Sequence, residues 1–121
     1  MDVKDLRIGS VIFAEGRPVI VDFITPVSVG YGNGNFAPIS SLLAFFQPIT
    51  LTEEILLKCG SKELKKGFHR FDRFNLKWME AYKYWYVTDI VTTSYITKVE
   101  FLHEWQNVVF VLNGEELTVN L

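Results

Sequence analysis

The stretch QPITLTEEILLKCG, residues 47–60, contains the start, the body and the end of a helix in consecutive residues. Thr52 is a good N-cap, because its hydroxyl oxygen accepts a hydrogen bond from a backbone N–H group that the first turn leaves free. The two glutamates that follow place negative charge at the positive end of the helix dipole. Gly60 suits the left-handed residue that ends many helices. The sequence therefore predicts a helix over residues 53–59, and the rest of the chain is interpreted around it.

Short apolar runs separated by turn residues precede this helix. Residues 10–14 and 17–24 flank a Glu-Gly dipeptide, which predicts a β-hairpin, and residues 27–29 add a third strand. The glycine-rich residues 30–35 are typical of a turn. Residues 40–46 fit a helical turn or a strand. These signals predict a small, strongly bent sheet that is SH3-like in its N-terminal part.

The residues after the helix form a second group of signals. Residues 61–67 are interpreted as a polar connector, and residues 68–90 are aromatic and alternating, which predicts two or three strands. Apolar residues at helical intervals predict a second helix over about residues 100–112, although residues 108–112 also suit a strand. Residues 117–121 alternate and predict a closing strand.

Together these elements predict an α+β fold in a single domain over residues 1–121. A bent antiparallel sheet, built from the N-terminal strands and the strands of residues 68–90, packs in it against two helices. The chain has 121 residues, 49% of them hydrophobic and 15% aromatic. That is enough to bury a core, and the aromatic surplus favours a fold that contains a sheet.

Charge and cysteine usage exclude several function classes. The net charge is −2, so no global field attracts nucleic acid or an anionic membrane. The one cysteine, Cys59, lies on an apolar helical face and is expected to be buried. No apolar run approaches the roughly 20 residues of a membrane helix, and the N-terminus does not resemble a signal peptide. We therefore expect a cytoplasmic location and no membrane partner.

No catalytic or metal-binding constellation has a recognisable spacing in this sequence. The glycines of residues 30–34 match neither a P-loop nor GxGxxG. His69, His103 and Cys59 are not arranged as CxxC, HxH or HExxH, and no GxSxG is present. The prediction is a protein that is not an enzyme, with no catalytic residues, no cofactor and no metal site.

Two stretches carry candidate binding residues. From Lys58 to Lys77, cations alternate with aromatic residues, a mixture that binds single-stranded nucleic acid through phosphates and bases. The candidate nucleic-acid contacts are Lys62, Lys65, Lys66, Arg70 and Arg73. The alternative is an amphipathic hairpin whose rings face the core while its cations are solvated.

The second stretch, residues 82–86, is rich in tyrosine and tryptophan, which are enriched at protein interfaces. The candidate contacts for a protein partner or for self-association are Tyr82, Tyr84, Trp85 and Tyr86. The alternative is a central strand with both faces buried in the monomer.

Three segments of the chain also resemble a known pattern: DLRIGS, FQPITLTEEILLKCG and VEFLHEWQNVVFVLNGEEL. They are similar to LRIGN, PIPLTEEILLKCGF and VHQLQNLYFALTGEEL in an uncharacterised family of small proteins from Bacteroidetes-type bacteria and their prophages and mobile elements. This chain departs from the pattern at Ser10, Thr50, Ser61 and Trp105. The resemblance implies a genomic context and supplies no activity, cofactor or site residue.

The expected function is a non-enzymatic binding or interaction module of phage or mobile-element origin. The alternative is a nucleic-acid-binding accessory protein that uses the basic and aromatic stretch from Lys58 to Lys77.

Overall fold

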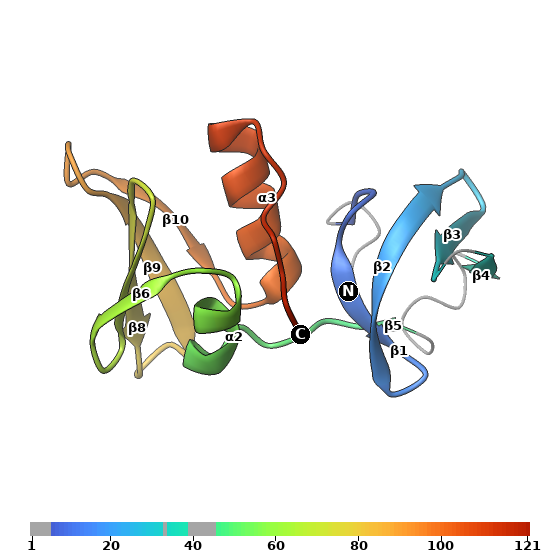
Figure 1. The fold of residues 1–121 in the computed structure, drawn as a ribbon, viewed down its shortest axis with the longest axis horizontal. Helices are drawn as coiled ribbons and strands as arrows, with labels where there is room; N and C mark the ends of the chain where they lie inside the picture. The colour runs from blue at the N-terminus through green and yellow to red at the C-terminus, as the bar shows by residue number, and fades with distance from the viewer. Residues whose placement is uncertain (1–5, 33, 39–45) are drawn as a thin grey trace. The chain divides into compact units, whose positions relative to one another are not determined.

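The computed structural model describes residues 6–32, 34–38 and 46–121. Across these residues the chain forms two five-stranded sheets and two helices, and every strand pairing is antiparallel (Figure 1). The predicted α+β class is confirmed. Of the ambiguous residues 40–46, all except Phe46 lie outside the described residues.

The chain divides into two compact units. The first contains Met1–Ile49 and Phe101–Glu116, and the second contains Thr50–Glu100 and Leu117–Leu121. Each unit has its own sheet and its own helix. The strands of residues 68–90 therefore belong to a different sheet from the N-terminal strands, whereas the sequence predicted one sheet. Alternation identifies the face of a strand that is buried, but it does not identify the partner strand. The single domain stays a prediction.

The first sheet is a succession of antiparallel strands. Its strands are β1 (Val11–Ala14), β2 (Arg17–Ile24), β3 (Ser28–Tyr31), β4 (Asn35–Pro38) and β5 (Phe46–Gln47). Their order across the sheet is β4-β3-β2-β1-β5. Glu15 and Gly16, with φ of 56° and 76°, join β1 to β2 as the sequence predicted. Positive φ at both residues is the signature of a type I′ hairpin turn.

Strand β3 extends further than predicted, because Gly30 belongs to it and not to the following turn. Gly30 pairs with Phe23 of β2. A Cβ atom on Gly30 would lie only 1.9 Å from the Phe23 ring, so the ring fills the space above the glycine. A ring that covers a strand glycine supplies the packing that the glycine itself lacks.

Helix α3 (Leu102–Asn113) belongs to the first unit and ends at Gly114, whose φ is 72°. The helix continues through residues 108–112, so the predicted helix is correct and the strand alternative is wrong. Gln106 is fully buried and connects the helix to the sheet. Its Oε1 accepts from the Val11 N–H at 2.8 Å, and its Nε2 donates to the Gly9 carbonyl at 3.0 Å.

Helix α2 (Glu53–Lys58) belongs to the second unit and has the predicted ends. The Thr52 Oγ1 accepts a hydrogen bond from the Ile55 N–H at 3.2 Å. At the other end Gly60 has φ of 93°, its N–H donates to the Leu57 carbonyl, and the Ser61 N–H donates to the Leu56 carbonyl. These two bonds form a Schellman motif, which satisfies the last carbonyls of the helix.

The second sheet begins with a strand that the sequence did not predict. Its strands are β6 (Lys62–Lys65), β7 (Phe68–Phe71), β8 (Phe74–Met79), β9 (Tyr84–Asp89) and β10 (Tyr95–Val99). They lie in the order β10-β9-β8-β7-β6. Strand β6 occupies the segment predicted to be a connector, because its backbone pairs with β7 although all four of its side chains are exposed.

The predicted closing strand over residues 117–121 is wrong. These residues form no strand. Leu117 is buried, and the Asn120 N–H donates to the Lys58 carbonyl at 3.4 Å. Alternation alone does not make a strand, because a strand also needs a neighbour with which its backbone can pair.

Candidate functional site

The strand registers of the second sheet determine which side chains share a face. Side chains of residues that are directly opposite in an antiparallel pair point to the same side of the sheet. Two rows of such partners cross all five strands. One row consists of Lys62, Arg70, Asn75, Thr88 and Tyr95. The other consists of Lys65, Phe68, Lys77, Tyr86 and Lys98.

These two rows, with Met79 and Tyr84, make up the outward face of the second sheet. None of its side chains is buried. The neighbouring row on the opposite side is Glu63, His69, Leu76, Val87 and Thr97, of which the three central residues are buried. The sheet thus has one core face and one face open to solvent.

The charges on the outward face all have the same sign. The face contains Lys62, Lys65, Arg70, Lys77 and Lys98, and none of its positions is an aspartate or a glutamate. Among the described residues none of these five cations forms an ion pair. The face therefore presents five positive charges that no neighbouring carboxylate neutralises.

Two carboxylates near the ends of β8 and β9, those of Glu80 and Asp89, accept hydrogen bonds from groups outside the outward face. Hydrogen bonds from Lys83 and then from Trp78 lower the pKa of Glu80. The backbone N–H of Thr92 is the main reason why the pKa of Asp89 is lowered. Both groups are ionised at neutral pH and already have partners.

Aromatic rings lie between the cations of the outward face. The rings of Tyr86 and Tyr95 stack with centroids 4.7 Å apart. The Lys98 Nζ lies 5.1 Å from the centroid of the Tyr84 ring, and the Lys65 Nζ lies 5.9 Å from that of Phe68. The cations thus lie over ring faces, where the ring quadrupole attracts them.

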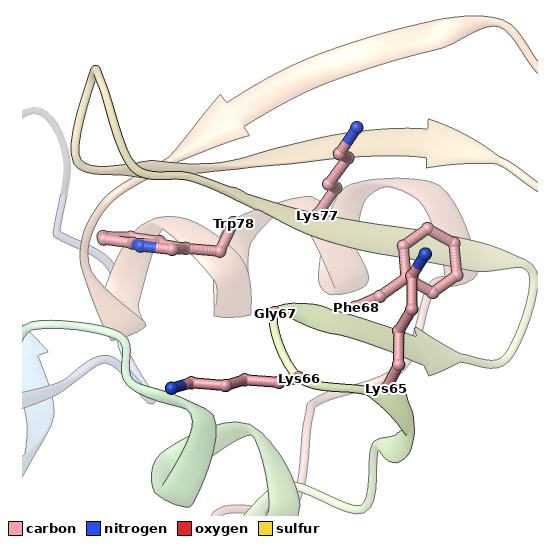
Figure 2. Close-up of a pocket in the computed structure, with 6 residues that line it drawn as sticks. All are labelled: Lys65, Lys66, Gly67, Phe68, Lys77 and Trp78. Atoms are coloured by element: carbon pink, nitrogen blue, oxygen red, sulfur yellow. The ribbon is translucent and has the colours of Figure 1, made fainter.

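A hollow of about 370 Å³ opens where the turn between β6 and β7 meets β8. It is lined by Lys65, Lys66, Gly67, Phe68, Lys77 and Trp78. Figure 2 shows the Lys65 ammonium group at the Phe68 ring, while Lys66 and Trp78 extend to the other side of the hollow. Gly67 has φ of 77°, which lets the chain turn here, and its N–H donates to the Glu53 carboxylate. The side chains of three lysines and two aromatic residues thus line the hollow.

The structure places the candidate nucleic-acid contacts in two groups. Lys62, Lys65 and Arg70 lie on the outward face, and Lys66 lies in the adjacent turn at the hollow. Arg73 lies in the turn between β7 and β8, where its Nε is 4.0 Å from Asp89 and its guanidinium covers the Phe74 ring. Arg73 is therefore occupied by interactions within the protein.

The candidate partner contacts are divided as well. Tyr84 and Tyr86 lie on the outward face, and the exposed Tyr82 stacks on Tyr84 with centroids 5.6 Å apart. Trp85 was predicted to be a contact but is only 2% exposed. Its Nε1–H donates to the Leu51 carbonyl at 2.8 Å, so the indole is a core residue that holds the segment before α2.

Sequence reasoning did not name four of the cations and rings of the outward face as candidate contacts: Phe68, Lys77, Tyr95 and Lys98. The first two lie within the basic stretch, but the other two are more than fifteen residues further along the chain than Lys77. The β-branched and aromatic residues of 95–99 were the available signal. A register shift between Tyr95 and Thr97 breaks the alternation, so only the register with β9 places Tyr95 and Lys98 beside Thr88 and Tyr86.

One group of potential metal ligands lies on the other side of the second sheet. Ligand atoms of Glu53, Glu63 and His69 all lie within 4.8 Å of one another. Cys59 is not in this group. Burial raises the pKa of its thiol to about 11, which disfavours the thiolate that metals bind.

No family model, curated protein or solved structure matches this chain. Within the part of the chain that the structure describes, no helix is long and apolar enough to cross a membrane.

Proposed function

We propose that this protein binds single-stranded nucleic acid on the outward face of the second sheet. The observation that carries the proposal is the strand register, which places five cations and four aromatic rings on one face without a carboxylate. Proteins that bind single strands combine a positive surface that follows the backbone with rings on which bases stack. A sheet surface that carries aromatic residues is a recurrent platform of this kind.

The distribution of charge along the chain supports the proposal. The second unit contains nine of the twelve lysines and arginines but only seven of the fourteen aspartates and glutamates, which gives it a net charge of +2. The first unit contains the other three cations and seven acids and has a net charge of −4. The whole chain is acidic, but its second unit is basic. Five of the six cations of this unit that form no ion pair lie on the outward face.

The rings supply the sequence-tolerant part of the interaction. Each base that stacks on an aromatic side chain contributes about 1–3 kcal/mol. Tyr95 is 52% exposed at the rim of the face and already stacks on Tyr86. A base can extend this stack without any change of backbone. The hollow beside Phe68 offers a second apolar contact, and the ammonium group of Lys65 at the Phe68 ring is available to a phosphate there (Figure 2).

The proposal is tested by fluorescence anisotropy with a labelled single-stranded oligonucleotide of mixed sequence at low salt. The test variant replaces Lys62, Arg70 and Lys77 with alanine. The control variant replaces Lys58, Arg73 and Lys83, which form ion pairs with Glu54, Asp89 and Glu80. Both variants lose three positive charges from the same unit. We expect the test variant to bind at least about tenfold more weakly than the control, because only its residues contact phosphate.

Two results would overturn the proposal. One is the absence of oligonucleotide binding by the unmodified protein at low salt. The other is an equal loss of affinity in both triple variants, since that would attribute binding to net charge and not to this face. Tyr95→Ala separates stacking from charge. We expect it to weaken binding about fivefold or more while the salt dependence stays unchanged.

A further inference from the structure

His69 has a ring nitrogen that no hydrogen bond satisfies. The side chain is fully buried, and its ring packs edge to face on Trp85 at 5.5 Å. The Nδ1 atom lies 3.1 Å from the Ser61 Oγ, but the Nε2 atom is buried without a hydrogen-bond partner. An unsatisfied buried polar atom costs free energy and calls for an explanation.

Two carboxylates face this nitrogen. Glu63 lies directly opposite His69 in the pairing of β6 with β7, so the two side chains share the core side of the sheet. Glu53, in the first turn of α2, approaches from the helix and brings its Oε1 to 3.4 Å from the His69 Nε2. Together they place three ligand atoms within 4.8 Å of one another.

The distances between these ligand atoms fit coordination of a single metal ion. Zinc binds imidazole nitrogen and carboxylate oxygen at about 2.0–2.2 Å in tetrahedral geometry. Two ligand atoms at about 2.1 Å from one ion, on adjacent tetrahedral directions, are about 3.4 Å apart. The distance between His69 Nε2 and Glu53 Oε1 is 3.4 Å, although the pair makes no hydrogen bond. The exposed Glu63 side chain is free to rotate towards the same point.

The surroundings of the three ligands suit a metal site. Metal-bound histidines usually donate their second N–H to an oxygen that fixes the ring orientation. The buried Ser61 Oγ occupies that position at Nδ1, and when Nδ1 carries the proton the Nε2 lone pair is available to bind a metal ion. The Gly67 N–H donates to Glu53 and holds its carboxylate in place.

We propose that Glu53, Glu63 and His69 bind a divalent transition-metal ion of the zinc class, which ties α2 to the hairpin of β6 and β7. Exposed Glu63 leaves the fourth coordination position open to water. The site lies on the side of the sheet opposite the outward face, and it does not depend on the proposed function.

Isothermal titration with ZnCl₂ tests the site on the full chain, with Co²⁺ as a spectroscopic probe. We expect one Zn²⁺ per chain and visible Co²⁺ absorption typical of tetrahedral coordination. Glu63→Gln should weaken Zn²⁺ binding at least about tenfold, because it replaces a charged ligand with a neutral amide. Glu54→Gln is the matched control, since it removes the same charge from another exposed glutamate of the second unit that lies outside the group, and it should change affinity less than about twofold.

Further variants give results that would either support or contradict the metal site. His69→Gln should abolish Zn²⁺ binding, and circular dichroism shows whether this buried substitution still folds. If His69→Gln does not fold, Glu63→Gln is the decisive variant, because Glu63 is exposed and its replacement leaves the core intact. Absence of Zn²⁺ binding by the unmodified protein would overturn the site. Equal affinity in Glu63→Gln and Glu54→Gln would also overturn it, since binding would then not depend on this group.

Discussion

At the scale of the single residue, Gln106 shows how one polar side chain holds a helix on a sheet. Its amide is fully buried and satisfies both the Val11 N–H and the Gly9 carbonyl. Side-chain amides match a donor and an acceptor at once, which an apolar residue of the same size does not.

Replacing Gln106 with leucine should destabilise the fold by about 2–4 kcal/mol, because the buried Val11 N–H and the half-buried Gly9 carbonyl lose their partner. Urea unfolding followed by circular dichroism measures the change. Val111→Ala, on the exposed side of the same helix, should stay within about 0.5 kcal/mol of the unmodified protein. A leucine variant as stable as this control would contradict the role of Gln106.

Cys59 gives a pH-dependent prediction. Burial raises the pKa of its thiol from the ordinary 9.0 to about 11, so at pH 8 the folded protein has about a hundredfold less thiolate than an exposed cysteine. Reaction with a disulfide reagent should be slower in the folded chain by that factor and should accelerate in urea. The unfolded chain releases this proton first, so stability falls as the pH rises from 9 towards 11. Equal rates in folded and unfolded protein would contradict burial.

Sequence reasoning succeeded for residues whose signal is local. Thr52 and Gly60 were predicted as helix ends because capping depends on atoms within four residues. The prediction that Trp85 contacts a partner was wrong, because the neighbouring tyrosines do not indicate which side of the sheet the Trp85 side chain faces. Its hydrogen bond reaches Leu51, which is 34 residues away.

At the scale of the element, α2 is six residues long and depends on its ends. Thr52→Ala removes the acceptor of the Ile55 N–H and should cost about 1 kcal/mol of unfolding free energy. Thr52→Ser keeps a hydroxyl in the same place and should cost much less. Thermal or urea unfolding compares the two. Equal stability of the alanine and serine variants would show that the cap contributes nothing.

Strand β6 and residues 117–121 mark the limits of element prediction. The side chains of β6 are all exposed, and lysine on an edge strand also protects the edge from pairing with another chain, so the segment resembled a connector. Residues 117–121 alternate as a strand would, yet they form none. In both cases the backbone partner decides the structure, and a local pattern contains no information about that partner.

At the scale of the whole molecule, the basic and aromatic residues were predicted separately, and the registers place many of them on one face. Lys62 and Arg70 were assigned to nucleic acid and Tyr84 and Tyr86 to a protein partner, and all four lie on the outward face. Two strand pairings add Lys77 and Lys98. The sequence could not show this, because alternation along each strand leaves the register between strands undetermined. A phage or mobile-element origin stays a prediction.

The central claim is that the five cations of the outward face contact phosphate. The most direct measurement is the dependence of oligonucleotide affinity on salt concentration, because each neutralised phosphate on a single strand contributes about −0.7 to the slope of log Kobs against log salt. We expect a slope of about −3.5 for the unmodified protein, and about −1.4 when Lys62, Arg70 and Lys77 are alanine. A slope near zero, or one that this substitution leaves unchanged, would contradict the account.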